Sequence, residues 1–176
     1  MRMARLVKLA KKGDKEALLQ LISEQQDEYY RLALSYMGNP HDAMDAMEEM
    51  IVSLYRHIPK LKKNESFYSW SKTILVNQCR QMLRKADRLI LLESFESEEF
   101  HSEDVLLERT EQSIDIQQML AVVNEQQRET IELKYFHDLD YKTIADITKV
   151  SVGTAKSRVF NGLNKIREAA RGEFDD

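Results

Sequence analysis

A basic segment near the C-terminus carries the residue types that most directly suggest chemistry, namely contacts to nucleic acid. Between Lys142 and Arg171 the chain has seven Lys and Arg residues against two acids, although its formal net charge is −4. Cations at this density attract phosphate backbones. Four apolar residues recur at helical spacing in this segment: Ala155, Val159, Leu163 and Ile166. The remaining positions of that helix are therefore available to a DNA groove.

A short helix and a tight turn must position this basic helix. Asp140 can cap a helix that holds Ile144 and Ile147, and Ser151 can cap one that starts at Val152. This is the pattern of a helix-turn-helix. The residues predicted to face DNA are Val152, Thr154, Lys156, Ser157, Arg158 and Asn161. The spacing does not separate base contacts from phosphate contacts.

Composition indicates a folded, helical protein. The chain has 176 residues, 43% hydrophobic and 32% charged, with only five Gly and two Pro. No segment alternates with a period of two, so an all-α fold is predicted. The single cysteine, Cys79, excludes an internal disulfide and fits a reducing compartment. The longest aliphatic run, Leu89 to Leu92, is too short for a membrane span, and a cytoplasmic location is expected.

The charge distribution divides the chain. Residues 86–116 contain ten acidic and two basic side chains and are rich in Glu and Ser. This pattern predicts two small helical domains, 1–86 and 113–176, joined by a flexible acidic linker over 87–112.

Capping and breaking residues give the expected helices. Periodicity covers residues 5–37 with a break at Gly13-Asp14. Asn39 and Pro40 begin a helix over about 40–57, and another is expected from about Ser66 to about Arg84. Asn124 begins a capping box for the helix that leads to Phe136.

Three motifs resemble one known family. The segment NEQQRETIELKYFHDLDYKTIADITKVSVGTAKSRV resembles the promoter-binding domain of bacterial sigma factors of the extracytoplasmic-function group. GNPHDAMDAMEEMI and SFYSWSKTILVNQCRQMLRK resemble region two of the same sigma-70 family. Their order and the total length predict an extracytoplasmic-function (ECF, group IV) sigma factor.

The resemblance implies a function and partners. The chain would bind core RNA polymerase and direct promoter-specific transcription initiation, for a stress or envelope-response regulon. Residues 1–86 would read and help melt the minus-ten element, and residues 113–176 would read the minus-thirty-five element. The implied partners are the clamp helices of the largest polymerase subunit, the flap of the second-largest, promoter DNA, and an anti-sigma factor. Such an inhibitor, where membrane-anchored, would hold the chain at the inner face of the membrane.

An acidic ridge is the predicted polymerase-binding surface. Asp42, Asp45 and Glu49 fall at i, i+3 and i+7 of one helix, and Glu48 adjoins them. In the family such a ridge packs on the clamp helices. A merely solvated helix face is the alternative interpretation.

Residues from Lys60 to Trp70 suit the capture of unstacked bases. Basic residues hold phosphates while aromatic faces and short polar side chains engage bases. Phe67 and Trp70 are expected to pack in the core, whereas Tyr68 is equally consistent with exposure. The predicted minus-ten contacts are Lys62, Lys63, Asn64, Ser66, Tyr68, Lys72, Asn77, Arg80 and Arg84.

The sequence departs from the family at four positions. Lys149 stands where the turn usually has Gly. If that position needs a left-handed backbone, Lys should cost about 1 kcal/mol or force a different turn. Asn161 and Gly162 stand where many relatives have Arg and Ala, and Gly162 is expected to weaken the helix slightly. Gln81 occupies a place that is often Asp.

The acidic linker has three open interpretations: a solubilising tether, a segment threading the polymerase near the RNA path, or an inhibitor of DNA binding by the free chain.

Two other classes of function are alternatives to this interpretation. A polymerase-independent helix-turn-helix regulator would bind duplex DNA tightly by itself. An enzyme is not expected, because the four histidines (His41, His57, His101, His137) lack metal spacing and no nucleophile or phosphate-loop motif occurs. No cofactor or metal is therefore expected.

Overall fold

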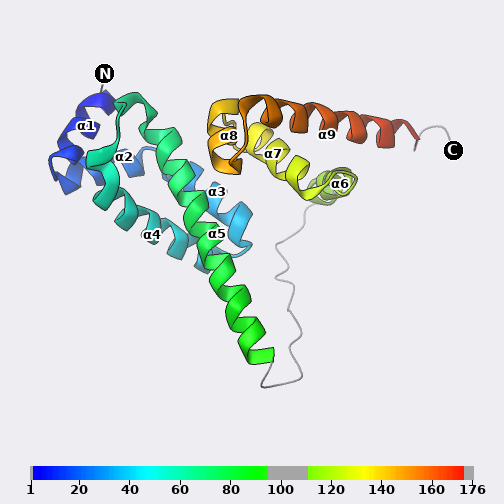
Figure 1. Cartoon of the computed structure of the whole chain (residues 1–176), viewed down its shortest axis with the longest axis horizontal. Coiled ribbons are helices and arrows are strands. Elements are labelled where there is room, and N and C mark those ends of the chain that lie inside the picture. Colours follow the sequence, from blue (N-terminus) through cyan, green and yellow to red (C-terminus); the bar gives the residue numbers. More distant parts are fainter. Residues whose placement is uncertain (1, 95–110, 173–176) are drawn as a thin grey trace. The chain divides into compact units, whose positions relative to one another are not determined.

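The computed structural model describes residues 2–94 and 111–172, which form two compact units, one before and one after residues 95–110 (Figure 1). Every regular element in these residues is a helix, which confirms the predicted all-α class. The central part of the predicted acidic linker lies outside the described residues, and the predicted domain boundaries stay predictions. No described helix combines the length and apolar character needed to cross a bilayer.

The first unit is built from five α-helices and two short 3-10 turns. Helices α3, α4 and α5 pack on one another, while α1 packs on α2 and against both turns. The largest fully buried side chains include Tyr29, Met50, Leu54 and Phe67. The elements are α1 (Arg2–Lys11), α2 (Lys15–Ser23), α3 (Gln26–Met37), α4 (Pro40–His57), η1 (Ile58–Lys60), η2 (Asn64–Ser66) and α5 (Phe67–Ser94).

Local capping explains where most of these helices begin. The Asp14 side chain accepts a hydrogen bond from the Ala17 N–H (3.1 Å), so the expected break at Gly13-Asp14 is confirmed. Asn39 caps α4 and Pro40 occupies its first turn, as predicted. A second break, at Glu24 and Gln25 between α2 and α3, was not predicted, because neither residue type is a strong helix breaker.

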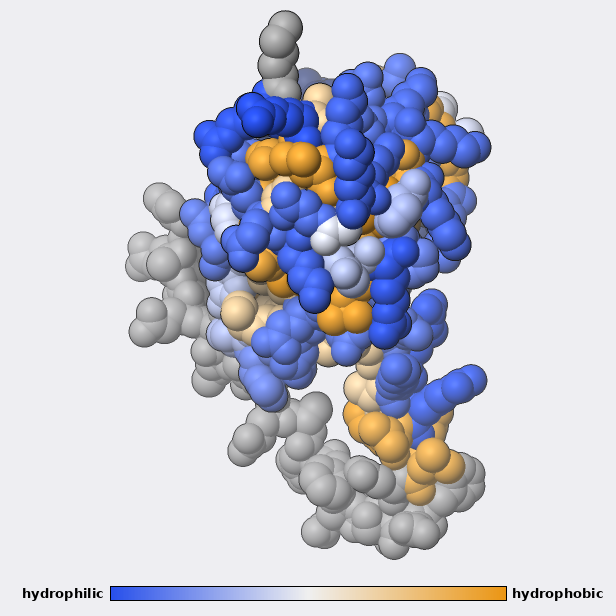
Figure 2. All heavy atoms as spheres, turned by 90° about the vertical axis from the view of Figure 1, so that its left-hand side faces the viewer, coloured by the Kyte–Doolittle hydropathy of each residue, from blue (hydrophilic) through white to orange (hydrophobic). Residues whose placement is uncertain are grey.

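Helix α5 extends about ten residues beyond the predicted end near Arg84. Its last turns contain Leu, Arg, Lys, Ala and Glu but neither Gly nor Pro, so intrinsic propensity continues the helix after its buried stripe ends. Residues 87–94, assigned to the linker from sequence, are therefore helical, as are 111 and 112 at the start of α6. The side chains from Leu89 to Leu92 are 59–66% exposed. Figure 2 shows apolar atoms where α5 ends, beside the residues drawn in grey.

Two polar contacts tie the start of α5 to α3. The hydroxyls of Tyr29 and Ser71 lie 2.6 Å apart in the core. The Lys72 ammonium donates to Glu28 Oε2 at 2.6 Å, with the Lys72 side chain 10% exposed and that of Glu28 45% exposed. The cation is thus the buried member of the pair.

This asymmetry predicts unequal effects of removing each partner. Glu28→Ala should lower the free energy of unfolding of the first unit by about 2 kcal/mol, because a buried ammonium is left unpaired. This loss is smaller than for a fully buried pair, because solvent screens the exposed Glu28 carboxylate. Lys72→Met should cost less than about 1 kcal/mol, because Met fills similar volume and Glu28 can be hydrated. Urea unfolding followed by Trp70 fluorescence would measure both. Equal losses would contradict this account.

The second unit contains α6 (Glu111–Leu120), α7 (Glu125–Tyr135), α8 (Tyr141–Thr148) and α9 (Val152–Gly172). Its core joins Leu120, Val123, Ile131 and Val159, and three partly buried side chains pack against it: Tyr141, Leu163 and Ile166. With Ala155 fully buried, the apolar stripe predicted for the basic helix faces the core.

Side-chain caps begin three helices of this unit. Asn124 and Gln127 form the predicted capping box of α7. Asp140 accepts from the Thr143 N–H at 2.7 Å, and Ser151 Oγ accepts from the Thr154 N–H at 3.0 Å. All three predicted starts are therefore confirmed.

Lys149 ends α8 in the left-handed region (φ 57, ψ 43). The turn that usually carries Gly therefore keeps its geometry here, and a lysine with a Cβ adopts it at a cost of about 1 kcal/mol.

Candidate polymerase and nucleic-acid interfaces

The face predicted to read DNA lies at the start of α9. Its exposed side chains are those of Val152, Thr154, Lys156, Ser157 and Asn161, while Arg158 is half-buried. This set combines two cations with short hydrogen-bonding groups and one apolar side chain, which is the chemistry required by phosphates, base edges and a thymine methyl group.

Neighbouring helices hold both cations of this face. The Lys156 Nζ lies 5.8 Å from the centre of the Tyr141 ring, and Lys134 Nζ lies 4.8 Å from the same ring. Arg158 Nη2 donates to Gln126 Oε1 at 3.1 Å. Tyr141 and Gln126 therefore orient groups on α9, a role that sequence reasoning missed because they come from α8 and α7.

The carboxylate of Asp140 stabilises the start of α8 near neutral pH. The backbone N–H of Thr143 bonds to Asp140 and holds the pKa of that carboxyl below its usual range, against a smaller opposing effect of burial. Asp140 is therefore ionised near neutral pH, and its negative charge also suits the N-terminus of a helix.

The residues predicted to contact the minus-ten element differ in their exposure to solvent. Lys62, Lys63, Asn77 and Arg84 are exposed, whereas Asn64, Ser66, Tyr68 and Arg80 are half-buried and Lys72 is buried. Phe67 is fully buried, as expected, and Trp70 is half-buried. Leu61 is also buried, so it anchors the loop while Lys62 and Lys63 remain available to a ligand.

Several of these side chains already have protein partners. Tyr68 donates to Glu24 Oε2 at 2.7 Å, and Lys11 donates to Asn64 Oδ1 at 2.8 Å. Burial, and then the Glu24 hydrogen bond, raise the pKa of Tyr68, so it remains a neutral phenol. A phosphate contact by Lys72 stays a prediction, and it would require the Lys72–Glu28 pair to open.

A groove between α4 and α5 contains most of the acidic ridge. Its volume is about 490 Å³, and Asp45, Glu48 and Glu49 line it from α4. The sequence assigned none of its other lining residues to the polymerase-binding surface; these are Val52, Ser53, Arg56 and His57 on α4 and Gln78, Gln81, Met82 and Lys85 on α5. The three acids form one wall of the groove beside apolar Val52 and Met82, while Arg56 and Lys85 also line it. This acidic wall suits the basic residues of an amphipathic partner helix.

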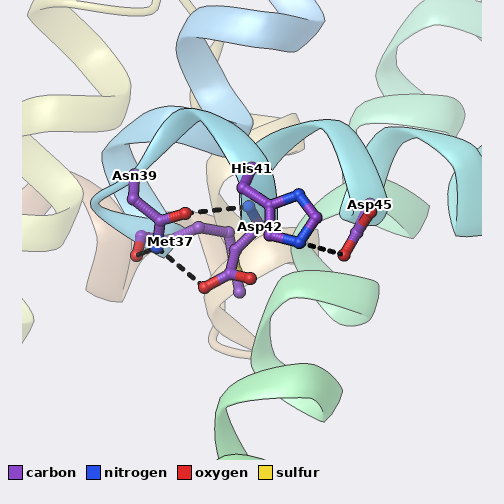
Figure 3. Close-up of polar contacts among 5 residues, drawn as sticks. All are labelled: Met37, Asn39, His41, Asp42 and Asp45. Atoms are coloured by element: carbon purple, nitrogen blue, oxygen red, sulfur yellow. Dashed lines mark hydrogen bonds and ion pairs between the residues drawn. The ribbon is translucent and has the colours of Figure 1, made fainter.

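Asp42, the fourth predicted acid, has a different local role. Figure 3 shows its carboxylate accepting from Asn39 Nδ2 (2.7 Å), while Asn39 Oδ1 accepts from the Asp42 N–H (2.9 Å). His41 Nε2 lies 3.9 Å from Asp45 Oδ2 one turn away. Possible ligand atoms of His41, Asp42 and Asp45 lie within 4.8 Å of one another, but the helix cap and the contact between His41 and Asp45 account for this geometry.

Cys79 is buried in α5. Burial is the main cause that raises the pKa of its thiol to about 11. The thiol is therefore protonated near neutral pH and packs as a small apolar group.

Comparisons with known proteins place both units in one family. The family model for Sigma-70 region 2 matches residues 21–89, and that for Sigma-70, region 4 matches residues 113–166. These matches cover well over half of the chain and fall on the two units in the same order as the motifs.

Curated relatives cover nearly the whole chain. The ECF RNA polymerase sigma factor SigW of Bacillus subtilis is 27% identical over 94% of this chain and 95% of its own length. The RNA polymerase sigma factor SigV of the same organism is 29% identical, with 89% and 93% covered. The ECF RNA polymerase sigma-E factor of Escherichia coli is 28% identical, with 92% and 90% covered.

Solved structures share the fold. CnrH, in complex with the cytosolic domain of CnrY, superposes with a TM-score of 0.68 at 17% identity, covering 98% of this chain and 99% of that one. The sigma factor RpoE of Bartonella quintana, in complex with the anti-sigma factor NepR, gives 0.64 at 21% identity, covering 86% and 95%. With both family models matched in order and relatives aligned along its length, the chain belongs to the sigma-70 family of sigma factors, in the extracytoplasmic-function group.

Proposed function

We infer that this chain binds core RNA polymerase and directs it to particular promoters. The inference rests on two different surfaces, which follow one another along the chain in the same order as regions two and four of the sigma-70 family. One unit has a groove with an acidic wall, and the other has a helix-turn-helix with an exposed cationic face. Sigma factors are initiation factors rather than enzymes, and no catalytic role is proposed.

The groove between α4 and α5 is the proposed site for the clamp helices of the largest polymerase subunit. Asp45, Glu48 and Glu49 supply negative charge, and the half-exposed Val52 supplies apolar surface. Electrostatic complementarity of this kind raises association rates and fixes orientation. The second unit is proposed to contact the flap of the second-largest subunit.

The loop from Lys62 to Ser66 is the proposed capture site for the minus-ten element. Opening ten base-pair steps costs roughly 14 kcal/mol at about 1.4 kcal/mol per step, which a unit of this size cannot supply alone. Trapping one or two unstacked bases costs far less, because stacking and edge contacts offset it. Lys62 and Lys63 are exposed for phosphate contacts, and Asn64 lies beside them for a base contact.

The exposed start of α9 is the proposed reader of the minus-thirty-five element. A recognition helix enters the major groove with the residues near its N-terminus against base edges. Lys156 and Arg158 are the proposed cationic contacts, with Val152, Thr154, Ser157 and Asn161 beside them.

An anti-sigma factor is the proposed inhibitor. The solved neighbours are complexes with the cytosolic domain of CnrY and with the anti-sigma factor NepR. We propose that such a partner covers the polymerase-binding groove, holds the chain in the cytoplasm at the inner face of the membrane where that partner is anchored, and releases it to a stress or envelope-response regulon.

Run-off transcription tests the proposed function. Purified chain would be mixed with bacterial core RNA polymerase and a pool of extracytoplasmic-type promoters, and start sites would be sequenced. Core-dependent initiation at a subset of promoters is expected. Tight duplex binding without polymerase and without initiation would instead identify a polymerase-independent regulator.

Lys156→Met tests the proposed reader. It should weaken all minus-thirty-five sequences alike, by about threefold to tenfold, and reduce the salt slope of binding by about one, because one phosphate contact is lost. Binding of the polymerase complex to several promoters at a series of salt concentrations would measure this. Lys165→Met, an exposed lysine later on the same helix, is the matched control. Loss confined to some promoters would show that Lys156 reads a base instead.

A further inference from the structure

We propose that Lys11 sets the base preference of the minus-ten loop by fixing the side-chain amide of Asn64. The inference depends on the proposed role of Asn64 as a base contact. Lys11 belongs to α1, outside residues 21–89 matched by the region 2 family model. In this proposal Lys11 is a positioning residue, and it comes from a helix that precedes the matched region.

The contact joins two elements far apart in sequence. Lys11 Nζ donates to Asn64 Oδ1 at 2.8 Å across 53 positions, and both residues are half-buried. Helix α1 packs against both 3-10 turns, so its end is held close to the loop. A charged donor in a partly desolvated place makes a stronger hydrogen bond than two neutral groups do.

The chemistry of the donor fixes which way the amide is turned. A lysine ammonium has three donors and no acceptor, so it must face the carbonyl oxygen of Asn64 rather than the amide nitrogen. The NH₂ group then remains available for a ligand. Asn64 is thereby set to donate to an acceptor on the edge of an unstacked base, and to disfavour a base that presents an amino group at the same place.

The rest of the loop supports a fixed orientation. Ser66 Oγ donates to the Lys63 carbonyl at 2.7 Å, which closes the turn that contains Asn64. Lys62 and Lys63 remain exposed on the same loop. The loop thus offers cations for the phosphates on either side of a base and one oriented amide for its edge.

Promoter selectivity measures this orientation. Core polymerase with each variant would transcribe a set of promoters in which every minus-ten position carries each of the four bases, with the minus-thirty-five element unchanged. A mismatched base typically weakens a specific site by roughly tenfold to a hundredfold. Asn64→Ala should remove the preference at one position. Lys11→Met should reduce that same preference by about fivefold, because the freed amide can present either its oxygen or its nitrogen.

Three comparisons isolate the positioning role. Lys11→Arg keeps a donor and should restore the preference, whereas a loss through altered packing would not be restored. Lys12→Met removes an adjacent, exposed lysine and should leave every position unchanged. The double variant Lys11→Met with Asn64→Ala should show no loss beyond Asn64→Ala alone, because both act through one contact.

The outcomes separate this inference from the proposed function. If Asn64→Ala changes one position and Lys11→Met leaves it unchanged, the positioning role of Lys11 is overturned while the capture loop stands. If Asn64→Ala changes no position, the base-contact role fails and the inference fails with it. If Lys11→Met lowers transcription equally from all promoters, Lys11 acts on folding or overall binding and the inference is wrong.

Discussion

Glu48→Lys combined with Glu49→Lys should weaken binding to core RNA polymerase at least about a hundredfold, which corresponds to roughly 3 kcal/mol. Both residues line the groove between α4 and α5 and are exposed. Reversal places like charges against a basic partner surface, and such juxtaposition costs several kcal/mol. Competition binding with a fluorescent wild-type chain would measure the loss at low and high salt, and the loss should shrink as salt screens the charges.

The folded state should tolerate this change. Lys and Glu have similar helix propensity, and both positions lie in the middle of α4, away from its ends. Glu16→Lys with Asp27→Lys makes the same change of charge on α2 and α3, where each acid lies in a first helical turn. That control should cost up to about 1 kcal/mol of stability per site and leave polymerase binding intact. Equal loss of binding in both variants would show that only net charge matters.

The second large effect concerns Gly162, which lies where α9 crosses α7. A Cβ there would come within 2.7 Å of Ile131 Cδ1 and 3.3 Å of Gln127 Cβ. Gly162→Val should therefore lower the free energy of unfolding of the second unit by about 3 kcal/mol, the upper range for overpacking a core. Hydrogen exchange of the α7 amides in the full chain would measure this without separating the units.

A smaller substitution tests the cause. Gly162→Ala should gain about 1 kcal/mol of helix propensity and lose more than that to the contact with Ile131. Ile131→Val removes the Cδ1 atom, so Gly162→Ala should become favourable in that background, giving a clear coupling energy. Gly153→Ala, at the start of α9, is the control and should be stabilising, because the nearest atom to an added Cβ is Ser151 Oγ at 3.8 Å, an ordinary van der Waals contact. Additive effects of the Gly162 and Ile131 changes would contradict the steric explanation.

Features set by neighbouring residues were predictable from sequence. The caps at Asn39, Asn124, Asp140 and Ser151 join residues three apart, and each is confirmed. At Lys149 two outcomes were open from the sequence, a left-handed backbone or a different turn, and the structure has the left-handed backbone.

Features that depend on distant partners were not predictable. The pairs Lys72–Glu28 and Tyr68–Glu24 each span 44 positions, so nothing in the local pattern indicates them. The same limit explains why Gly162 was interpreted as a slight weakness of the helix, when the structure makes it the place where two helices approach. The end of α5 was misplaced for a different reason: hydrophobic periodicity reports burial, and this helix continues after burial ends.

Consecutive caps in the second unit have a consequence for recognition. Because Asn124, Asp140 and Ser151 each fix the first turn of their helix through a side chain, the backbone of the proposed reader is ordered before DNA binds. Little conformational entropy then remains to be lost on docking, and most of the gross contact energy is kept as affinity. If α9 reads the promoter as proposed, promoter preference can therefore be changed by substituting the few exposed side chains on α9, while the helical scaffold stays unchanged.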